Sequence, residues 1–529
     1  MNDAAPLFIG VSGSGGALTA ETAGSKAAQL WRMSTLGLNV PPAFVLPTGL
    51  CAAINCHDQA ALETLDRGLR NGIAKLEETT GRRLGDTRAP LLVSVRSGAA
   101  QSMPGMLETI LNVGLNAESV RGLIELTGNP RLAWDSYRRF IQIYAEVVEE
   151  VPAAAFEARL ADMIRSENVA QESDLDPEAL ERLTREFHAL AAQAAGRAIP
   201  DDPMEQLVAA ARAVYRSWDS ARAKEYRRLN RLEHLTGTAV TIQAMVFGNA
   251  GGTSGAGVAF SRNPATGAKE LYLDFLFDAQ GEDVVAGRRV PGNGALLAAR
   301  LPHVATELAQ AAARLEGEFR DIQDIEFTVE EGKLFFLQTR SAKRTPRAAL
   351  RVLVDFVREG LLEPASALER VAAIDLERAR ITRFTDTVPA IATAQSAAPG
   401  VATGRVVFDS VRAQALALDH QPVILLRHNT STEDVAGFAV AAGILTAVGG
   451  RTAHAAVVAR QLGKVCLVGC HDLRVDESSR CGEIGGKKIA EGDWLSLDGD
   501  TGEVALGRRS IIAELPAAEL AEIDGWRRH

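Results

Sequence analysis

The feature that most constrains the fold is a regular alternation of short apolar runs and helical patterns in the last quarter of the chain. Between about Val401 and Gly507, the strand-like runs PVILL, GILTA and KVCLVG are separated by the helical segments TEDVAGFAVAA and AHAAVVARQL. Strands that alternate with helices in this way are typical of α/β domains. We therefore expect an α/β domain over residues 401–510, followed by a helical tail over residues 511–529.

The rest of the chain falls into two further regions. Residues 1–345 contain a helical insert at about 130–235, where apolar residues recur every three or four positions. Around this insert lie strand-like runs at residues 91–95, 239–245 and 333–339. Residues 346–400 begin as helix and end in IATAQSAAPG, residues 391–400, a small-residue segment that we interpret as a hinge linker. A chain of 529 residues is too long for one hydrophobic core, so the sequence predicts an α/β multidomain protein.

Composition and charge narrow the class of protein. The net charge is −10, with 47% hydrophobic and 23% charged residues, which is the balance of a soluble globular protein rather than of a nucleic-acid-binding one. The start of the chain has no basic segment followed by an apolar core, and no apolar run approaches the roughly 18 residues of a membrane span. The five cysteines match no paired C-x-x-C metal site. We expect a cytoplasmic enzyme with no nucleic-acid or membrane partner.

One histidine stands in a context suited to phosphoryl chemistry. In GGRTAHAAVVARQLGK, residues 449–464, a strand ends before two glycines, Thr452 can cap a helix and Gly463 can end it. His454 then lies in the first helical turn, where unpaired backbone N–H groups favour an anion such as a phosphoryl group, and Arg451 can add positive charge. A neutral imidazole nitrogen can attack phosphorus without a strong base. A histidine that only packs against a loop gives the same local pattern.

A second candidate site is a strand–turn–strand segment, DIQDIEFTVEEGKLFFLQTR, residues 321–340. Alternation along a strand puts Asp324 and Glu326 on one face, and Gln338 and Arg340 on one face of the partner strand. Paired carboxylates suit Mg²⁺, which keeps several waters and bridges nucleotide phosphates. A guanidinium neutralises charge on a phosphoryl group during its transfer. A solvated hairpin with alternating polar residues would show the same pattern.

The histidine segment and its flanking strands, GILTAVGGRTAHAAVVARQLGKVCLVGC, resemble the phosphohistidine domain of the pyruvate, phosphate dikinase and phosphoenolpyruvate synthase family. The resemblance implies a swivelling β/β/α domain in which His454 carries the phosphoryl group. It also implies a phosphohistidine loop made of Gly449, Gly450, Arg451 and Thr452. We expect this domain to move as a body about the linker.

Segments before the linker resemble the ATP-grasp nucleotide-binding region of the same family. They are AGSKAAQLWRMSTLGLNVPPAFVLPT, LLVSVRSGAAQSMPGMLETILNVGLN, AWDSYRRFIQIY, AVTIQAMVFGNAGGTSGAGVAFSRNPATG with AQGEDVVAG, and the strand–turn–strand segment. The resemblance implies catalytic roles for His454, Arg340 and Arg96. It implies nucleotide or phosphate binding by Lys26, Arg96, Gly105, Arg139, Gln243, Met245, Glu282, Asp324, Glu326, Gln338 and Arg340, with Mg²⁺ held by Asp324, Glu326 and Gln338.

The chain departs from the family pattern at two places in this region. The family usually has Gly-Gly-Lys at its phosphate-binding lysine, whereas this chain has Gly24, Ser25 and Lys26. The family motif commonly reads Ser-Gly-Thr-Gly, whereas residues 254–257 read Ser-Gly-Ala-Gly. Taken alone, the glycine cluster of the whole segment, GNAGGTSGAG at residues 248–257, is a weak phosphate-loop signal or an ordinary β-turn. Because Ala256 lacks a hydroxyl that could hydrogen-bond phosphate, the change is expected to slow catalysis or alter the phosphate chemistry.

The resemblance implies an ATP-dependent phosphotransferase that phosphorylates His454. The family's dikinase converts ATP and phosphate to AMP and pyrophosphate, and the quoted segments are closer to the dikinase than to the synthase, in which water replaces phosphate. A full-length dikinase continues into a (β/α)₈ barrel of about 250 residues, which binds phosphoenolpyruvate or pyruvate. Only about twenty residues follow the histidine domain here, so we expect the acceptor to lie on a separate protein.

Two other functions stay open. The chain can be a self-contained dikinase-type kinase of a small molecule other than pyruvate, with the acceptor bound, for example, on the helical insert. It can also be a non-catalytic nucleotide-sensing regulator, although the charged phosphate-site residues are retained. The expected partners are ATP, phosphate, Mg²⁺ and an acceptor protein or small molecule. A homodimer is also open.

Overall fold

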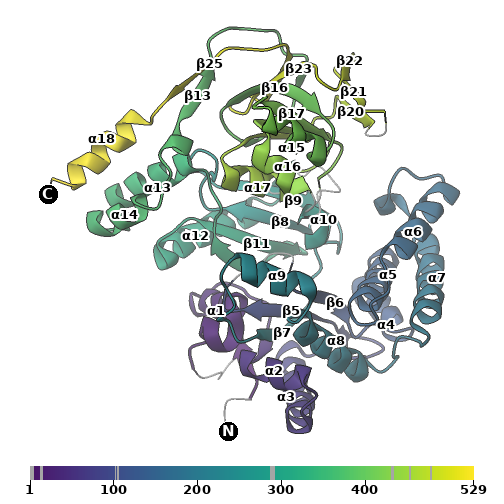
Figure 1. Cartoon of the computed structure of the whole chain (residues 1–529). Coiled ribbons are helices and arrows are strands. Elements are labelled where there is room, and N and C mark those ends of the chain that lie inside the picture. Colours follow the sequence, from purple (N-terminus) through teal and green to yellow (C-terminus); the bar gives the residue numbers. More distant parts are fainter. Residues whose placement is uncertain are drawn as a thin grey trace. The chain divides into compact units, whose positions relative to one another are not determined.

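The computed structural model describes residues 5–11, 16–101, 103, 106–285, 292–430, 434–451, 454–476 and 479–528. These residues divide into two compact units (Figure 1). The first comprises residues up to Gly251 together with residues 335–338, and the second comprises residues 252–334 and 339–529. The division passes through one strand, β12 (Lys333–Ser341).

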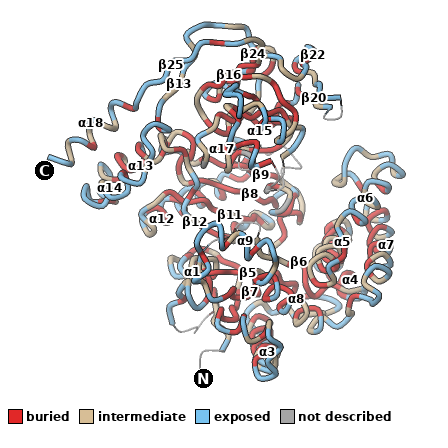
Figure 2. Tube along the Cα trace, viewed as in Figure 1, coloured by how far each residue is buried: buried red, intermediate tan, exposed pale blue. Residues whose placement is uncertain are grey.

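The first unit is built on an antiparallel sheet with the strand order β1-β2-β7-β5-β6. Its strands are β1 (Leu7–Ile9), β2 (Ala43–Leu46), β7 (Thr238–Ala244), β5 (Val93–Ala99) and β6 (Thr109–Val113). A short ribbon of β3 (Arg83–Leu84) and β4 (Pro90–Leu91) precedes β5. All residues of β2 and β7 are buried (Figure 2). The strand expected at residues 239–245 is confirmed as β7, and the run expected at 91–95 is divided between the end of β4 and the start of β5.

Helices surround this sheet and fill the region between β6 and β7. They are α1 (Ala20–Thr35), α2 (Cys51–Asn55), α3 (Gln59–Thr80), α4 (Ser119–Thr127), α5 (Pro130–Val147), α6 (Ala154–Ser166), α7 (Pro177–Ala195), α8 (Pro203–Ser217) and α9 (Ala221–Leu229). The start of α5 shows why the chain turns helical there: Asn129 accepts a hydrogen bond from the Leu132 amide, and Pro130 occupies the first turn. The expected helices at about residues 130–235 are thus present as α5 to α9, and α5 packs on both α7 and β6.

The second unit contains a sheet with the order β10-β9-β8-β11-β12. The remaining strands are β8 (Gly255–Phe260), β9 (Tyr272–Phe277), β10 (Gly292–Asn293) and β11 (Gln323–Glu330). The glycine cluster at residues 248–257 is only partly a turn: residues 248–249 and 252–253 are turns, but Gly255 already begins a buried strand. A Cβ on Gly255 would lie 2.2 Å from the Phe275 ring, and one on Gly257 would lie 2.5 Å from the Phe327 ring. These glycines make room for aromatic side chains on one face of β8.

Further helices of this unit are α10 (Gly281–Val285), α11 (Gly294–Arg300), α12 (Pro302–Phe319), α13 (Pro346–Arg358) and α14 (Pro364–Val371). A buried arginine joins two of them to β8. Arg262 is the second residue after the end of β8. It donates hydrogen bonds to Glu316 of α12 and to Glu359 just after α13. Its guanidinium carbon also lies 4.6 Å from the centre of the Phe356 ring. Because the charge of Arg262 is matched by two carboxylates, it can be buried without an unpaired ion.

The second unit also contains an eight-stranded sheet with the order β14-β24-β23-β16-β17-β18-β19-β15. Its central strands β16 (Val401–Val407), β17 (Val423–Arg427), β18 (Gly443–Thr446) and β19 (Val465–Val468) are parallel and joined through α15 (Ser410–Leu418), α16 (Val435–Val440) and α17 (His454–Leu462). β23 (Trp494–Asp498) and β24 (Glu503–Leu506) add an antiparallel hairpin. The alternation of strands and helices predicted from the sequence is confirmed, including the helix that begins at His454.

The small-residue segment at residues 391–400 differs from the expected linker. It forms β14 (Ala392–Thr393), paired with β24, and β15 (Gln395–Ala398), paired with β19. The small side chains serve packing here, because Ala397 and Ala398 are buried under α17 and β19. The connection into this sheet runs instead through β13 (Ile381–Phe384), which pairs with β25 (Ile511–Glu514) before the terminal helix α18 (Ala517–Trp526).

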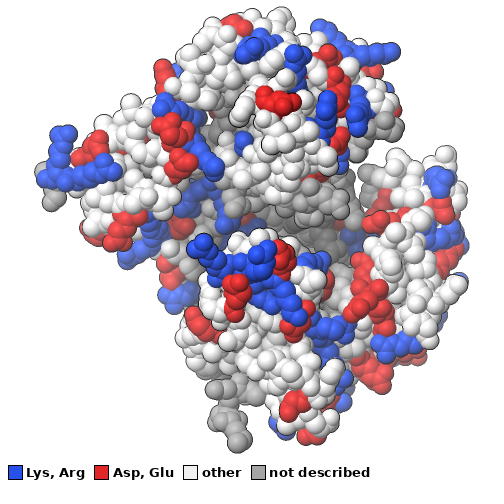
Figure 3. All heavy atoms as spheres, viewed as in Figure 1, with Lys and Arg blue, Asp and Glu red and all other residues white. Residues whose placement is uncertain are grey.

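Charged side chains of both signs are interspersed on the face of the molecule shown in Figure 3. Around α9, basic side chains are paired with acidic ones: Lys224 with Asp219, and Arg228 with Glu225. A small antiparallel sheet consists of β20 (Leu473–Asp476), β21 (Cys481–Ile484) and β22 (Lys487–Ala490). Within the described residues, no helix is both long and apolar enough to cross a membrane.

Candidate functional site

Lys26 is positioned by a kink in α1. The helix is interrupted at Gly24, whose φ and ψ are 78° and 154°, a conformation open essentially to glycine alone. The kink brings α1 against β5, because a Cβ on Gly24 would lie only 2.1 Å from the carbonyl oxygen of Gly98. Ser25 secures the contact by donating its hydroxyl proton to the Ala99 oxygen at 3.0 Å. Lys26 therefore leaves α1 directly beside the end of β5.

Arg96 lies two residues before Gly98 on the same strand. Its Nη1 donates to the side-chain oxygen of Gln243 at 3.2 Å and to the Leu337 carbonyl at 3.4 Å. Gln243, on β7, is buried and donates in turn to the Pro41 carbonyl at 3.2 Å. The structure thus joins Arg96 to Gln243 and places the Cβ of Lys26 4.0 Å from a Cβ built on Gly98, two residues along the same strand.

Two other predicted residues of the first unit have different surroundings. Arg139, on α5, pairs with Asp135 at 3.0 Å and with Glu172 at 3.2 Å. Burial alone would raise the pKa of Asp135, but the neighbouring Arg139 and Arg138 lower it to about 2. Arg139 is therefore part of a carboxylate network within the helices. The backbone amide of Met245 donates to the Leu92 carbonyl at 2.9 Å. Gly105 lies outside the described residues.

The second unit places two of the predicted charged residues in direct contact. Asp324 on β11 is buried, and its Oδ2 accepts a hydrogen bond from Nε of Arg340 on β12 at 2.8 Å. Burial raises the pKa of Asp324, and Arg340 opposes that shift. Burial also disfavours the charged form of Arg340, but the attraction of Asp324 and Glu326 outweighs it and raises the pKa of Arg340. The alternation predicted for this hairpin is confirmed, and it gathers two carboxylates and one guanidinium.

The donor set at Asp324 and Glu326 fits a hard cation. Oδ1 of Asp324 is buried and has no hydrogen-bond partner in the described part of the chain, so one carboxylate oxygen remains to bind. Gln338 is also buried and lies two positions before Arg340 on β12. Among the described residues no group of three or more His, Cys, Asp or Glu side chains could hold a metal. Two carboxylates suffice for Mg²⁺, which keeps several waters. Glu282 lies on α10, and its side chain is outside the described residues.

Ala256 faces the same side of the sheet as these carboxylates. The register pairs Ala256 with Thr328, Val258 with Glu326 and Phe260 with Asp324. Residues directly opposite in an antiparallel pair point to the same face. The hydroxyl that Ala256 lacks would therefore have pointed into this face, in line with the two carboxylates.

The histidine loop contacts the same sheet. Arg451 donates through Nη2 to the Leu273 carbonyl at 3.0 Å, and its Nε lies 3.4 Å from Oδ1 of the buried Asp274. Its guanidinium carbon lies 4.2 Å from the centre of the Tyr272 ring. Arg451 was expected to add positive charge beside the histidine. In the structure the carboxylate of Asp274 on β9 partly neutralises that charge.

His454 begins α17, at the end where unpaired N–H groups gather. Gly449 precedes it with a φ of 108°, which favours glycine in the turn after β18. Gly449 and Gly450 are both buried. Thr452 and the side chain of His454 lie outside the described residues. The expected position of the histidine at a helix start is confirmed.

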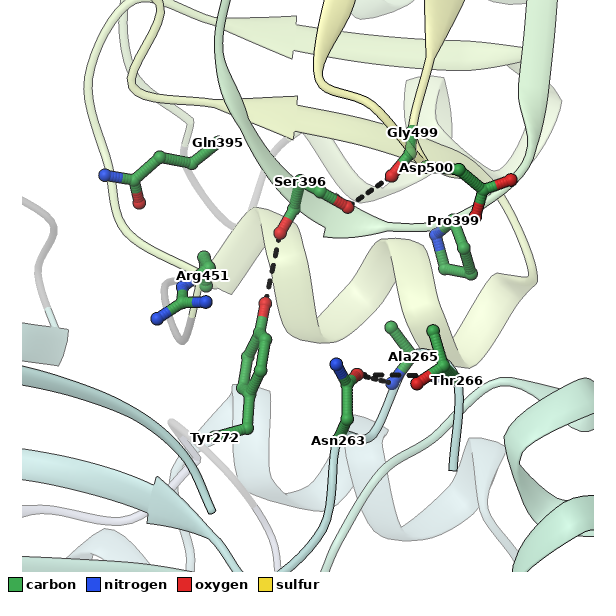
Figure 4. A pocket seen from close by; sticks show the side chains of 10 residues that line it. All are labelled: Asn263, Ala265, Thr266, Tyr272, Gln395, Ser396, Pro399, Arg451, Gly499 and Asp500. Carbon is green, nitrogen blue, oxygen red and sulfur yellow. Dashed lines mark hydrogen bonds between the residues drawn. The ribbon is translucent and has the colours of Figure 1, made fainter. Parts of the chain in front are cut away.

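A cavity of about 370 Å³ lies beside this loop (Figure 4). Tyr272 and Arg451 line one part of it, and Tyr272 donates its hydroxyl proton to the Ser396 carbonyl at 3.0 Å. Sequence patterns gave no prediction for three residues near this loop: Tyr272, Asp274 and, on α17, Arg460. The signal for Arg460 was available, because it is a charged residue in an otherwise apolar stretch of helix, AAVVARQL.

Comparisons with known proteins match two parts of the chain to family descriptions. Residues 62–304 and 302–359 match the model of the pyruvate phosphate dikinase, AMP/ATP-binding domain. Residues 419–502 match the PEP-utilising enzyme, mobile domain. The chain is 45% identical over 489 residues to a pyruvate, phosphate dikinase of Clostridium symbiosum, covering 92% of this chain and 56% of that protein. It is 43% identical over 510 residues to pyruvate, phosphate dikinase 2 of Zea mays, and this match covers 96% of this chain and 58% of that protein. The chain thus spans little more than half the length of these relatives.

We predict that Gly24→Ala destabilises the first unit far more than Gly37→Ala. Both glycines have positive φ, 78° and 75°, so each alanine carries a backbone cost of about 1 to 3 kcal/mol, at the upper end for Gly24 because of its ψ of 154°. Only at Gly24 does the new Cβ meet backbone atoms, whereas nothing lies within 4 Å of a Cβ at Gly37. We expect a loss of about 3 kcal/mol or more at Gly24, measured by urea unfolding followed by circular dichroism. Equal losses would show that the approach of α1 to β5 does not depend on Gly24.

Proposed function

Because the chain belongs to the pyruvate phosphate dikinase AMP/ATP-binding domain family, we propose that it is an ATP-dependent phosphotransferase that phosphorylates its own His454. The observation that carries the proposal is the contact of the histidine loop with the sheet of Asp324 and Arg340. Arg451 anchors that loop on β9, and the hairpin β11–β12 belongs to the same sheet. A helix-start histidine and a cluster of phosphate-directed charges thus lie in one compact unit.

Each charged group has a role that its surroundings support. We assign binding of the ATP phosphates to Lys26 and Arg96, which the kink at Gly24 and the bond to Gln243 hold in place. We assign stabilisation of the transferring phosphoryl group to Arg340, whose planar guanidinium presents several donors in fixed directions. Gln243 and Met245 are proposed for the adenine, and Arg139, Gly105 and Glu282 for further phosphate contacts, on the resemblance of their segments to the family.

Asp324, Glu326 and Gln338 are the residues that would hold Mg²⁺. Bound there, the ion would neutralise phosphate charge and orient the phosphoryl group. Asp324 suits this role because its free Oδ1 is buried and accepts no hydrogen bond from the described residues. Its other oxygen is held by Arg340, which fixes the orientation of the carboxylate.

The proposed reaction begins with attack of a His454 ring nitrogen on the β-phosphorus of ATP. An N–P bond forms, the P–O bond to the α-phosphate breaks, and AMP leaves with the bridging oxygen. Inorganic phosphate then takes the terminal phosphoryl group as pyrophosphate, and one phosphoryl group stays on the histidine. The helix start of α17 favours this anion through its unpaired N–H groups.

We also propose that the phosphoryl group passes to an acceptor on a separate protein, with a small-molecule acceptor as the second candidate. Support comes from the description of the family matched by residues 419–502 as a mobile domain, because a histidine that moves can serve two sites. The ribbon of β13 and β25 is the connection about which such a movement is proposed.

We predict that incubation with Mg·ATP and phosphate places a phosphoryl group on His454 in an acid-labile, base-stable bond. Intact-mass spectrometry detects the adduct, and chromatography of the nucleotides after one turnover should show AMP. His454→Ala should abolish the label with nucleotide binding retained, whereas His428→Ala, a change at an exposed histidine after β17, should leave it unchanged. Absence of an adduct would refute the proposed function, and stoichiometric ADP would place the protein among ordinary kinases.

We predict that Arg340→Ala and Glu326→Ala each lower the labelling rate by a factor on the order of a thousand. The fold should survive loss of Arg340, because Asp324, whose pKa burial already raises, can take up a proton. Arg344→Ala is the matched control: Arg344 lies three residues after β12 and pairs with Asp321 at 2.8 Å. Quench-flow measurement of labelling decides the point, and near-normal rates for Arg340→Ala would contradict the role of the hairpin.

We predict that the phosphorylated protein keeps its label when mixed with pyruvate alone and loses it rapidly when a partner protein that binds the acceptor is added. Radiolabel on His454 can be followed by gel filtration after each mixing. Rapid transfer to pyruvate without a second protein would contradict a separate acceptor protein and favour a self-contained kinase.

A further inference from the structure

The register of the sheet β9-β8-β11 aligns residues in rows across one face. Tyr272 lies opposite Phe260, and Phe260 lies opposite Asp324. Opposite residues of antiparallel strands share a face, with Cβ atoms about 5 Å apart. Arg340 extends the row through its hydrogen bond to Asp324. The row therefore runs from two aromatic rings to the pair that we assign to phosphoryl transfer.

Two arginines of the histidine segment lie over this row. The guanidinium carbon of Arg451 lies 4.2 Å from the centre of the Tyr272 ring. That of Arg460, six residues beyond His454 on α17, lies 5.3 Å from the centre of the Phe260 ring. The two arginines thus occupy neighbouring positions, and the next position along the row is Asp324.

Arg460 is fully buried, with 0% of its surface exposed. Its Nη1 donates to the Ala397 carbonyl at 2.9 Å and to the Arg451 carbonyl at 2.8 Å. Its Nε and Nη2 have no hydrogen-bond partner within the described ranges. Burial lowers the pKa of Arg460, and the side chains around it, Asp324 among them, oppose that shift. A buried cation without a bonded counter-ion is costly, so its position needs a physical reason.

Asp324 has the complementary property. Its Oδ1 is also buried without a partner in the described part of the chain. Arg460 and Asp324 therefore carry opposite charges and incompletely satisfied polar atoms. Arg460 lies over the Phe260 ring, and Asp324 is the residue opposite Phe260 in the sheet. Charges in a poorly solvated interior attract one another more strongly than charges in water.

We propose that Arg460 is a positioning residue that docks the histidine segment on the β9-β8-β11 sheet through the charge of Asp324. Its two bonds to backbone carbonyls tie the position of the histidine loop and of β15 to this contact. The negative charge of Asp324 then sets the fraction of molecules in which the histidine segment is docked on the sheet. The biological meaning of this device rests on the proposed function, but docking itself needs no ATP and no phosphorylation.

The experiment measures docking as a distance. Spin labels are placed on Glu307→Cys, on the exposed side of α12, and on Lys487→Cys, on β22, after Cys56→Ser and Cys481→Ser remove the exposed native thiols. Double electron–electron resonance without nucleotide gives the ratio of docked to undocked molecules. We expect Asp324→Asn to lower this ratio about fivefold or more. In an Arg460→Gln background, which keeps a donor but removes the charge, Asp324→Asn should change the ratio less than about twofold.

Matched variants separate charge from packing. Arg405→Gln is the control, because Arg405 also donates to a backbone carbonyl, that of Gly492 at 2.7 Å, and lies 4.9 Å from the Trp494 ring in the same eight-stranded sheet. It should leave both the ratio and its dependence on Asp324 unchanged. Arg460→Lys keeps the charge and should retain the dependence.

The proposal therefore requires that Asp324→Asn changes the ratio of docked to undocked molecules more when Arg460 is present than in the Arg460→Gln variant. An equal effect in both backgrounds, or a ratio that none of these substitutions changes, would overturn the proposal. If Arg460→Gln does not fold, Arg460→Lys decides, because loss of the Asp324 dependence in that variant also overturns it. Failure of His454 labelling with this coupling intact would refute the proposed function and leave the docking inference standing.

Discussion

The antiparallel register between β8 and β11 is the constraint on which the second unit's site depends. It sets Phe260 opposite Asp324 and Val258 opposite Glu326, so both carboxylates face the side that the histidine segment contacts. A shift by one residue would turn both of them to the opposite face. The opposite face holds the register, because Gly255 and Gly257 leave space that the Phe275 and Phe327 rings fill. The two rings stack with centroids 5.8 Å apart and planes at 7°.

In the first unit, the close approach of the α1 backbone to the β5 backbone sets the positions of the charged residues. Gly24 allows α1 to touch β5, and Ser25 donates a hydrogen bond to Ala99 where the family usually has a second glycine. The departure at Ser25 thus has a structural use, since its hydroxyl fastens the kinked helix to the strand. This contact sets the place of Lys26 beside β5, and the bond to Gln243 holds Arg96 on the same strand. The positions of the charges are therefore set by backbone packing before any ligand is considered.

The sequence predicted those parts of the structure that depend on local patterns. Strand and helix alternation located β17, β18 and α17, and period-two alternation placed Asp324 and Glu326 on one face. Prediction from local sequence patterns failed where packing between separate strands determines the role of a residue. The glycines before Phe260 leave space for aromatic rings of the paired strands β9 and β11, and the small residues at 391–400 form strands at the two edges of a sheet. Neither partner is near in sequence. Arg460 was missed because its significance depends on Phe260, two hundred residues earlier along the chain.

The contacts between the histidine segment and the sheet are of a kind that permits release. They are an arginine on an aromatic ring, an arginine beside a carboxylate, a tyrosine hydroxyl on a carbonyl, and a cavity of about 370 Å³. A continuous apolar interface would bury area that must be hydrated again on opening, which costs roughly 25 cal/mol per Å². Guanidinium and hydroxyl groups instead regain hydration when they separate, so the two states differ less in free energy. An incompletely paired Arg460 narrows that difference further, because docking leaves two of its nitrogens without partners among the described residues. Under the proposed function, contacts of this kind would let charge hold the histidine segment on the sheet during the reaction and would let the segment leave when that charge changes.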